Sequence, residues 1–170
     1  MTILTIMRHA KSSWDHEGLD DFERPLNDRG GKAAVRIGEE MAARKMRFDV
    51  VIASPAVRVR QTLKGVAEGF GNLPEPQFDP RIYSAPTETL LAIIEALPET
   101  AHAPLLVGHN PGLHQLALAL TKDDAAGYRR QVQQAFPTAV VAVIELPFTR
   151  WDEVRTGEGT LRELILPRAL

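Results

Sequence analysis

Apolar and polar residues alternate along this chain in two distinct patterns. Short runs rich in β-branched residues predict strands at 2–7, 48–54, 103–108 and 138–146, with weaker candidates at 77–82 and 160–166. Between them, longer stretches with apolar residues three to four positions apart predict helices at 28–45, 56–70, 87–97, 111–121 and 123–134. Such alternation is typical of βαβ units. We therefore expect an α/β fold, a three-layer sandwich with a mostly parallel central sheet flanked by helices.

Local signals refine this expectation at the C-terminus and at the helix starts. The segment PFTRWDEVRTGEGT between the last two strands contains Gly and Pro, which favours an antiparallel pair and predicts an antiparallel edge strand near the C-terminus. Side chains that cap free backbone N–H groups indicate where helices begin. The candidates are Asn27 or Asp28, then Thr87, and finally Asn110 followed by Pro111.

Composition limits the classes of protein that this chain can represent. At 170 residues with 44% hydrophobic and 25% charged, it matches one globular domain, which we expect to span residues 1–170. The net charge of −2 predicts no nucleic-acid or membrane partner. Because there is no Cys, disulfides and cysteine nucleophiles are excluded. The first residues form neither a signal peptide nor a spanning helix, so we expect a cytoplasmic protein.

Cationic and imidazole side chains follow three of the predicted strands at the point where each strand ends. Arg8 and His9 come after the first strand, Arg58 follows the second, and His109 follows the strand at 103–108. In open α/β sheets, ligands bind beyond the carboxyl ends of the strands. Pro111 opens a helix whose free N–H groups would point to the same place. Two guanidinium groups with two imidazoles suit a phosphoryl group, which has three peripheral oxygens to be held.

Each of these motifs alone has an ordinary structural interpretation, and their convergence is what favours a site. The remaining histidines, His16, His102 and His114, lack metal-ligand spacing, and we interpret them as structural or solvated. The sequence contains no metalloprotease, P-loop, dinucleotide-binding or nucleophile-elbow motif. Two arginines and a helix N-terminus can supply the positive charge that Mg²⁺ supplies elsewhere, so we expect no metal and no cofactor.

These motifs carry a family resemblance. The segments RHA after the first strand, ERPLNDRG at 23–30, SPAVRVRQT at 54–62 and GHNPG at 108–112 resemble the histidine phosphatase (phosphoglycerate mutase-like) superfamily. Within it, RHAKSSW and GHNPGL are most similar to SixA-type phosphohistidine phosphatases. The resemblance implies that His9 is the nucleophile, that Arg8 and Arg58 hold the phosphoryl group, and that His109 donates hydrogen bonds to the transferring oxygens. It also leaves three candidates for further substrate contacts, namely Lys11, Ser12 and Asn110.

A histidine nucleophile attacks phosphorus with a neutral ring nitrogen and needs no separate base. We therefore expect His9 to be neutral, with its other N–H held by a backbone carbonyl. His109 could instead work protonated, in which case the surroundings of the two histidines would keep them in different charge states.

The sequence does not assign a general acid. Glu88 is one candidate, although an acid in the first turn of a helix is more simply explained by the helix dipole, and Asp15 and Asp21 are alternatives. A site without an acid would favour phosphohistidine, because an imidazole leaves more easily than an alkoxide. Trp14 and Trp151 are interpreted as core residues, with the mouth of the site as the alternative.

The predicted function is therefore hydrolysis of a phosphate-bearing substrate, and a phosphohistidine protein is the favoured one. Two alternatives stay open at this stage. One is a phosphatase of small phosphoesters such as sugar phosphates or nucleotides, and the other is a non-catalytic phosphate-binding module. The sequence leaves the oligomeric state open.

Overall fold

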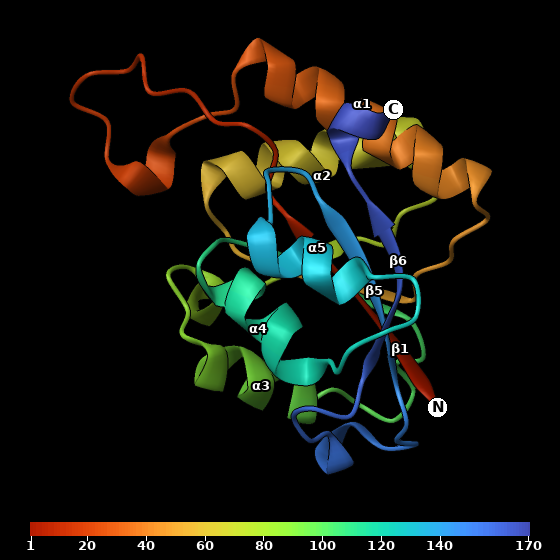
Figure 1. The fold of residues 1–170 in the computed structure, drawn as a ribbon. Helices are drawn as coiled ribbons and strands as arrows, with labels where there is room; N and C mark the ends of the chain where they lie inside the picture. The colour runs from red at the N-terminus through yellow and green to blue at the C-terminus, as the bar shows by residue number, and fades with distance from the viewer.

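The computed structural model describes all 170 residues, which form one six-stranded sheet with helices on both faces (Figure 1). The strand order is β3-β2-β4-β1-β5-β6. The strands are β1 (Thr2–Arg8), β2 (Val50–Ala53), β3 (Pro76–Phe78), β4 (Pro104–Gly108), β5 (Val141–Leu146) and β6 (Thr160–Ile165). The helices are α1 (Asp28–Ala43), α2 (Val57–Phe70), α3 (Thr87–Glu95), α4 (Gly112–Leu120) and α5 (Tyr128–Gln134).

The pairing of the strands confirms the predicted α/β sandwich. Strands β1 to β4 pair in parallel, whereas β5 runs antiparallel to both β1 and β6. The edge strand β6 therefore forms the antiparallel pair expected from the Gly- and Pro-containing connection before it. Because the carboxyl ends of β1, β2 and β4 lie at one edge of the sheet, the residues that follow these strands are brought together.

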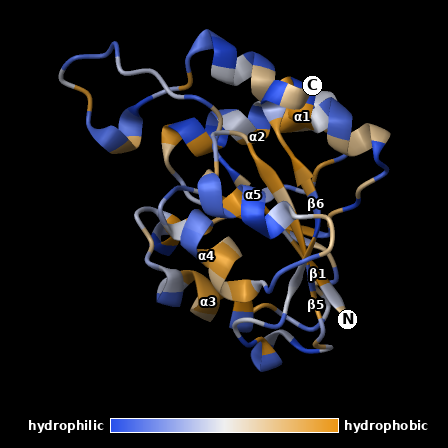
Figure 2. Cartoon of the chain, viewed as in Figure 1, coloured by the Kyte–Doolittle hydropathy of each residue, from blue (hydrophilic) through white to orange (hydrophobic).

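Successive side chains of the strands point to opposite faces of the sheet and pack into two separate hydrophobic cores, one on each face. Leu4 and Ile6 of β1 pack with α3, α4 and α5, whereas Met7 of the same strand packs with α1 and α2. Figure 2 shows the strands of the sheet as largely hydrophobic and the outer helix faces as hydrophilic. The sheet is thus covered on both faces, which explains the near-continuous apolar runs of its strands.

The two helices on one face approach each other through glycines. A Cβ added to Gly38 of α1 would lie 2.3 Å from the carbonyl oxygen of Val66, and one added to Gly69 of α2 would lie 2.1 Å from that of Val35. Real Cβ atoms do not approach so closely, so both positions need glycine for this packing. The backbones of α1 and α2 are consequently in direct contact.

The start of α1 agrees with the sequence expectation, whereas the starts of α3, α4 and α5 differ from it. Asn27 caps α1 as predicted, and its side chain accepts a hydrogen bond from Gly30 N–H. Thr87 is already the first residue of α3, and the Asn110 side chain donates to another segment rather than capping α4. The last helix was expected over 123–134 and begins only at Tyr128, because the Asp124 carboxylate accepts hydrogen bonds from the backbone N–H groups ahead of it.

Smaller differences concern the weaker elements. The strand expected at 77–82 is split, since β3 ends at Phe78 and Pro80 opens a single 3₁₀ turn. Trp151 is buried and donates its indole N–H to the carbonyl of Ala101, as a core tryptophan does, whereas Trp14 is 77% exposed. None of the helices is both long enough and apolar enough to cross a membrane.

Candidate active site

A cavity of about 880 Å³ opens at the carboxyl ends of β1, β2 and β4. Arg8 and His9 reach it from the end of β1, Arg58 from the first turn of α2, and His109 from the residue after β4. Two hydrogen bonds of Thr62 join these segments, because its hydroxyl accepts from Ala10 N–H at 2.9 Å and donates to the Arg58 carbonyl at 2.7 Å. The structure thus brings together the four residues that the strand ends were expected to deliver.

His9 is held in one ring orientation by the backbone beside it. Its Nδ1 lies 2.7 Å from the carbonyl oxygen of Ala10, which can only accept, so Nδ1 carries the proton and Nε2 keeps its lone pair. Burial, and then the positive charges of Arg58 and Arg8, lower the pKa of His9 from 6.5 to about 4. The ring is therefore neutral at neutral pH, with its free nitrogen suited to nucleophilic attack.

His109 lies beside His9 with the ring centroids 5.2 Å apart. Its Nε2 is 2.7 Å from the hydroxyl oxygen of Ser54, and its Nδ1 is buried without a partner. Burial and the neighbouring His9 lower the pKa of His109 to about 3. Both histidines are neutral at neutral pH, so the idea that they hold different charge states is wrong, because the same desolvation acts on both rings.

Arg8 and Asn110 are anchored at one shared point. The Arg8 Nη1 donates to the carbonyl of Phe136 at 3.1 Å, and the Asn110 Nδ2 donates to the same carbonyl at 2.8 Å. Arg8 Nε and Asn110 Oδ1 are buried and make no hydrogen bond within the chain. Both residues line the cavity, and the shared carbonyl of Phe136 fixes the positions of their side chains.

Arg58 is positioned by Asp21, which belongs to the long connection between β1 and α1. Its Nη1 donates to the backbone carbonyl of Asp21 at 2.6 Å and its Nη2 to the carboxylate at 3.0 Å. The same carboxylate accepts from the Tyr83 hydroxyl at 2.6 Å and from Arg24 Nε at 3.1 Å. The hydrogen bond from Tyr83, followed by those from the arginines, lowers the pKa of Asp21 to about 2, so Asp21 is ionised at neutral pH.

Arg24 is a residue of the site that the sequence interpretation missed. Its Nη1 donates to the Ser12 hydroxyl at 2.8 Å and to the Ser13 carbonyl at 3.2 Å, and its guanidinium lies 3.5 Å from the centre of the Trp14 ring. These contacts hold Ser12 and Trp14 at the cavity wall. The only sequence signal for Arg24 was its place in the family-like segment ERPLNDRG.

Some of the other candidate residues line the cavity and others do not. Lys11 and Ser12 line it, Lys11 as an exposed side chain. Glu88 is exposed in the first turn of α3, and neither Glu88 nor Asp15 lines the cavity. Asp21 is therefore the only carboxylate among the lining residues. No group of three or more His, Asp and Glu side chains is placed to hold a metal ion.

The histidines that were interpreted as structural lie away from the cavity. His114 is half-buried, contacts the Val132 carbonyl through Nε2 and stacks on Phe136. His16 and His102 are exposed. The chemistry of the cavity thus rests on two neutral imidazoles and three guanidinium groups, and this combination suits an in-line displacement at a phosphoryl group.

Comparison with known proteins gives consistent results. Residues 4–83 match the sequence profile of the histidine phosphatase superfamily (branch 1). The uncharacterised protein Rv1276c of Mycobacterium tuberculosis is 33% identical over 165 residues, which cover 95% of this chain and 100% of that protein.

Two solved structures share the fold over nearly the whole chain. A protein from Agrobacterium tumefaciens assigned as phosphohistidine phosphatase SixA superposes with a TM-score of 0.82 at 28% identity, covering 98% of each chain. The protein histidine phosphatase SixA complexed with tungstate gives a TM-score of 0.80 at 21% identity, again covering 98% of each chain.

Proposed function

The chain belongs to the histidine phosphatase superfamily and is a phosphatase with a histidine nucleophile, and we propose that it hydrolyses phosphohistidine carried by a protein, with His9 as the nucleophile. In this proposal Arg8 and Arg58 hold the phosphoryl oxygens, and His109 and Asn110 complete the cradle. Arg24 and Asp21 act as positioning residues, because they fix Ser12 and Arg58.

The first step forms a bond between His9 Nε2 and phosphorus while the bond from phosphorus to the substrate imidazole breaks. The electron pair of that bond returns to the leaving nitrogen, and the imidazole leaves neutral when its far nitrogen already carries a proton. The two arginines neutralise the charge on the peripheral oxygens throughout the transfer. No proton has to move to the leaving group in this step.

The second step repeats the same chemistry with His9 as the leaving group. Water attacks phosphorus, its proton goes to the phosphate product, and the electron pair of the N–P bond returns to Nε2. Because the Nδ1 proton of His9 is held by the Ala10 carbonyl, the ring leaves as a neutral imidazole. The hydrogen bond that directs Nε2 toward phosphorus thus also makes His9 a good leaving group.

The observation that carries the substrate proposal is the absence of a protonated carboxylic acid from the cavity wall. Its only carboxylate, Asp21, is kept ionised by Tyr83 and two arginines, and Glu88 lies outside the cavity. An alkoxide leaving group needs a proton from such an acid, whereas a protonated phosphohistidine does not. The site therefore supports cleavage of a P–N bond better than that of an alkyl P–O bond.

A rapid-quench experiment tests this proposal. The enzyme is mixed with a phosphohistidine protein, an aryl phosphate and an alkyl phosphate, each ³²P-labelled, and quenched in alkali, with His9→Ala as the control. We expect acid-labile, base-stable label on the wild type and none on His9→Ala, and faster turnover of phosphohistidine than of the alkyl phosphate.

Other results would support the alternative functions. Equal or faster turnover of the alkyl phosphate would favour a phosphatase of small phosphoesters. Phosphate binding without any label or turnover would favour a binding module, in which His9→Ala spares the affinity.

A further inference from the structure

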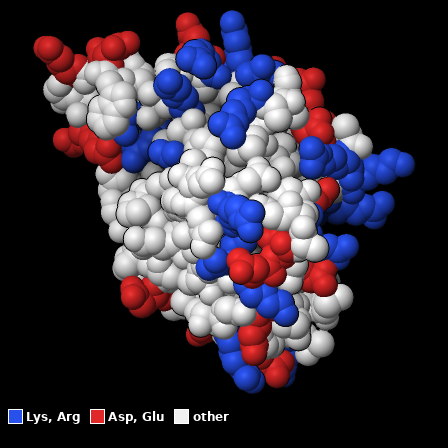
Figure 3. All heavy atoms as spheres, viewed as in Figure 1, with Lys and Arg blue, Asp and Glu red and all other residues white.

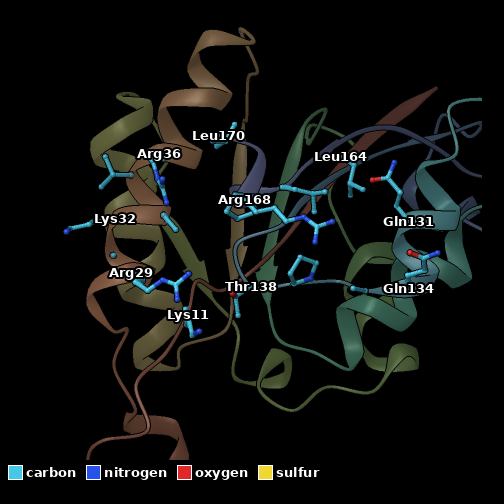
Figure 4. Close-up of a pocket in the computed structure, with 17 residues that line it drawn as sticks. Lys11, Arg29, Lys32, Arg36, Gln131, Gln134, Thr138, Leu164, Arg168 and Leu170 are labelled. Atoms are coloured by element: carbon cyan, nitrogen blue, oxygen red, sulfur yellow. The ribbon is translucent and has the colours of Figure 1, made fainter.

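A second cavity, a groove of about 980 Å³, lies beside the cavity that contains His9 and Arg58, which we call the phosphate-binding cavity in line with the proposed function. Figure 4 shows Arg29, Lys32 and Arg36 along one wall, which is formed by α1. Gln131 and Gln134 of α5 lie on the opposite wall. The groove thus lies between helices from opposite faces of the sheet, next to the end of the edge strand β6.

All charged side chains that line the groove are cationic. Its five cationic lining residues are Lys11, Arg29, Lys32, Arg36 and Arg168. None of the five takes part in an ion pair, and no Asp or Glu side chain lines the groove. Figure 3 shows Lys and Arg side chains gathered over the start of α1 and the C-terminal end of the chain. On a chain with a net charge of −2, this cluster is a local positive surface that suits an acidic partner.

The form of the groove favours a macromolecule over a small anion. All five cations are exposed, whereas small-ligand sites usually enclose their ligand with a few convergent polar groups. The groove also contains apolar side chains, among them Leu164, Leu166 and Leu170. A groove that combines exposed cationic side chains with apolar ones is complementary to a segment that has acidic and apolar faces.

The groove is continuous with the phosphate-binding cavity. Lys11, Pro137 and Thr138 line both of them, and Lys11 and Thr138 lie at one end of the groove in Figure 4. A protein whose phosphohistidine enters the cavity at His9 would therefore extend its neighbouring surface over α1 and the end of β6.

We propose that this groove docks an acidic segment of the phosphohistidine protein while its phosphorylated histidine is at His9. The inference rests on the proposed function and adds the chemistry of the partner to it. Attraction between exposed charges acts mainly on the rate of encounter and on KM. Because dissolved salt screens exposed charges, this contribution falls as the salt concentration rises. The bond-breaking steps at His9 are unchanged.

Kinetics on matched probes test the proposal. Two synthetic peptides each carry one phosphohistidine, one with glutamates in the flanking segment and the other with glutamines at the same positions, and free phosphohistidine serves as a substrate without a flank. In the variant Arg29→Glu/Lys32→Glu/Arg36→Glu, the groove loses its positive wall while every residue assigned to the phosphate-binding cavity stays in place.

The matched control is Arg47→Glu/Lys64→Glu/Arg155→Glu. These three residues are exposed, make no ion pair and line neither the groove nor the phosphate-binding cavity. The control changes the net charge of the protein by the same amount. Any difference between the two variants therefore reports the position of the charges rather than their number.

We expect the wild type and the control to hydrolyse the glutamate peptide with a kcat/KM roughly tenfold or more above that for the glutamine peptide at low salt. The groove variant should lose this preference through KM, and all three proteins should hydrolyse free phosphohistidine equally. A wild type without the preference, or a groove variant that keeps it, overturns the docking proposal. So does a groove variant that is equally slow on free phosphohistidine, since the substitutions would then act on the phosphate-binding cavity.

Two further outcomes would overturn the docking proposal in different ways. If the wild type does not hydrolyse free phosphohistidine or either peptide, the proposed function fails and the docking proposal fails with it. If inorganic pyrophosphate binds the wild type and not the groove variant while the peptides show no preference, the groove is a small-anion site and the docking proposal is wrong.

Discussion

His9 should become protonated only at a much lower pH than an ordinary histidine does. The ring is only 6% exposed and lies near two guanidinium groups, and burial lowers its pKa from 6.5 to about 4. A neutral Nε2 is required for attack on phosphorus. Activity that depends on this nitrogen should therefore persist into mildly acidic solution.

The expected size of the effect follows from the two pKa values. At about pH 5, a histidine with a pKa near 4 is about 90% neutral, whereas one with a pKa of 6.5 is only about 3% neutral. The burial of His9 thus preserves roughly 30-fold more nucleophile at this pH. The neutral fraction of His9 therefore rises with pH, and the ring is almost entirely neutral by about pH 6.

Side-chain NMR measures this quantity directly. Long-range ¹⁵N–¹H spectra of the histidine-labelled protein, recorded in phosphate-free buffer between about pH 8 and pH 4, report both the tautomer and the protonation of each ring. The His9 signals are assigned by their loss in His9→Ala. The pH dependence of kcat/KM with an aryl phosphate provides the functional counterpart, because it reports the free enzyme.

A His9 ring that titrates near 6.5 would refute this reasoning, as would a ring whose neutral form carries its proton on Nε2. The first result would mean that the ring is hydrated despite its burial. The second would mean that the Ala10 carbonyl does not fix the tautomer, and the lone pair would then face away from the cavity.

Three further predictions follow from the same structure. Unfolding returns both His9 and His109 to their ordinary pKa of 6.5, so the unfolded chain binds more protons below that pH. The free energy of unfolding, measured by urea denaturation, should therefore fall between about pH 6.5 and 4 by about 3 kcal/mol for each of the two rings, and a flat profile would contradict this. Gly30→Ala should lower the free energy of unfolding by about 1–3 kcal/mol, since its Cβ would lie 2.1 Å from the Lys11 carbonyl oxygen, whereas Gly31→Ala, with nothing within 4 Å, should be neutral or stabilising; equal effects would show that α1 can shift freely. Asp21→Asn should change the turnover of alkyl and aryl phosphates by the same factor, because Asp21 is ionised and positions Arg58; a selective loss on the alkyl ester would instead identify a general acid.

The parts of the site that the sequence predicted are those set by the topology of the sheet. Arg8 ends β1, and His9 and His109 directly follow β1 and β4. Arg58 lies in the first turn of the helix after β2, and parallel strands deliver such residues to one edge of the sheet. Their placement could therefore be predicted before any distance was known. The hydrogen bond from His9 to a backbone carbonyl was also expected, because a nucleophilic imidazole needs a fixed tautomer.

The parts that the sequence did not predict depend on long connections and competing side chains. Arg24 reaches the cavity only because the segment between β1 and α1, which extends away from the body of the molecule in Figure 1, folds back on Ser12 and Ser13. The delayed start of α5 depends on the Asp124 carboxylate, which binds backbone groups more effectively than another helical turn would. Neither contact leaves a periodic signal in the sequence.

The close packing of α1 on α2 has a consequence for substrate choice. The helices touch backbone to backbone at Gly38 and Gly69, so they cannot slide past each other without a collision. Arg58 belongs to α2, while three of the groove cations belong to α1. In the proposed complex, the distance between the phosphoryl group and the acidic segment is therefore fixed by the packing of α1 on α2. A substrate would then be selected by the distance at which its acidic residues stand from its phosphohistidine, and lengthening that distance with a rigid spacer should abolish the advantage of the acidic residues without changing their number.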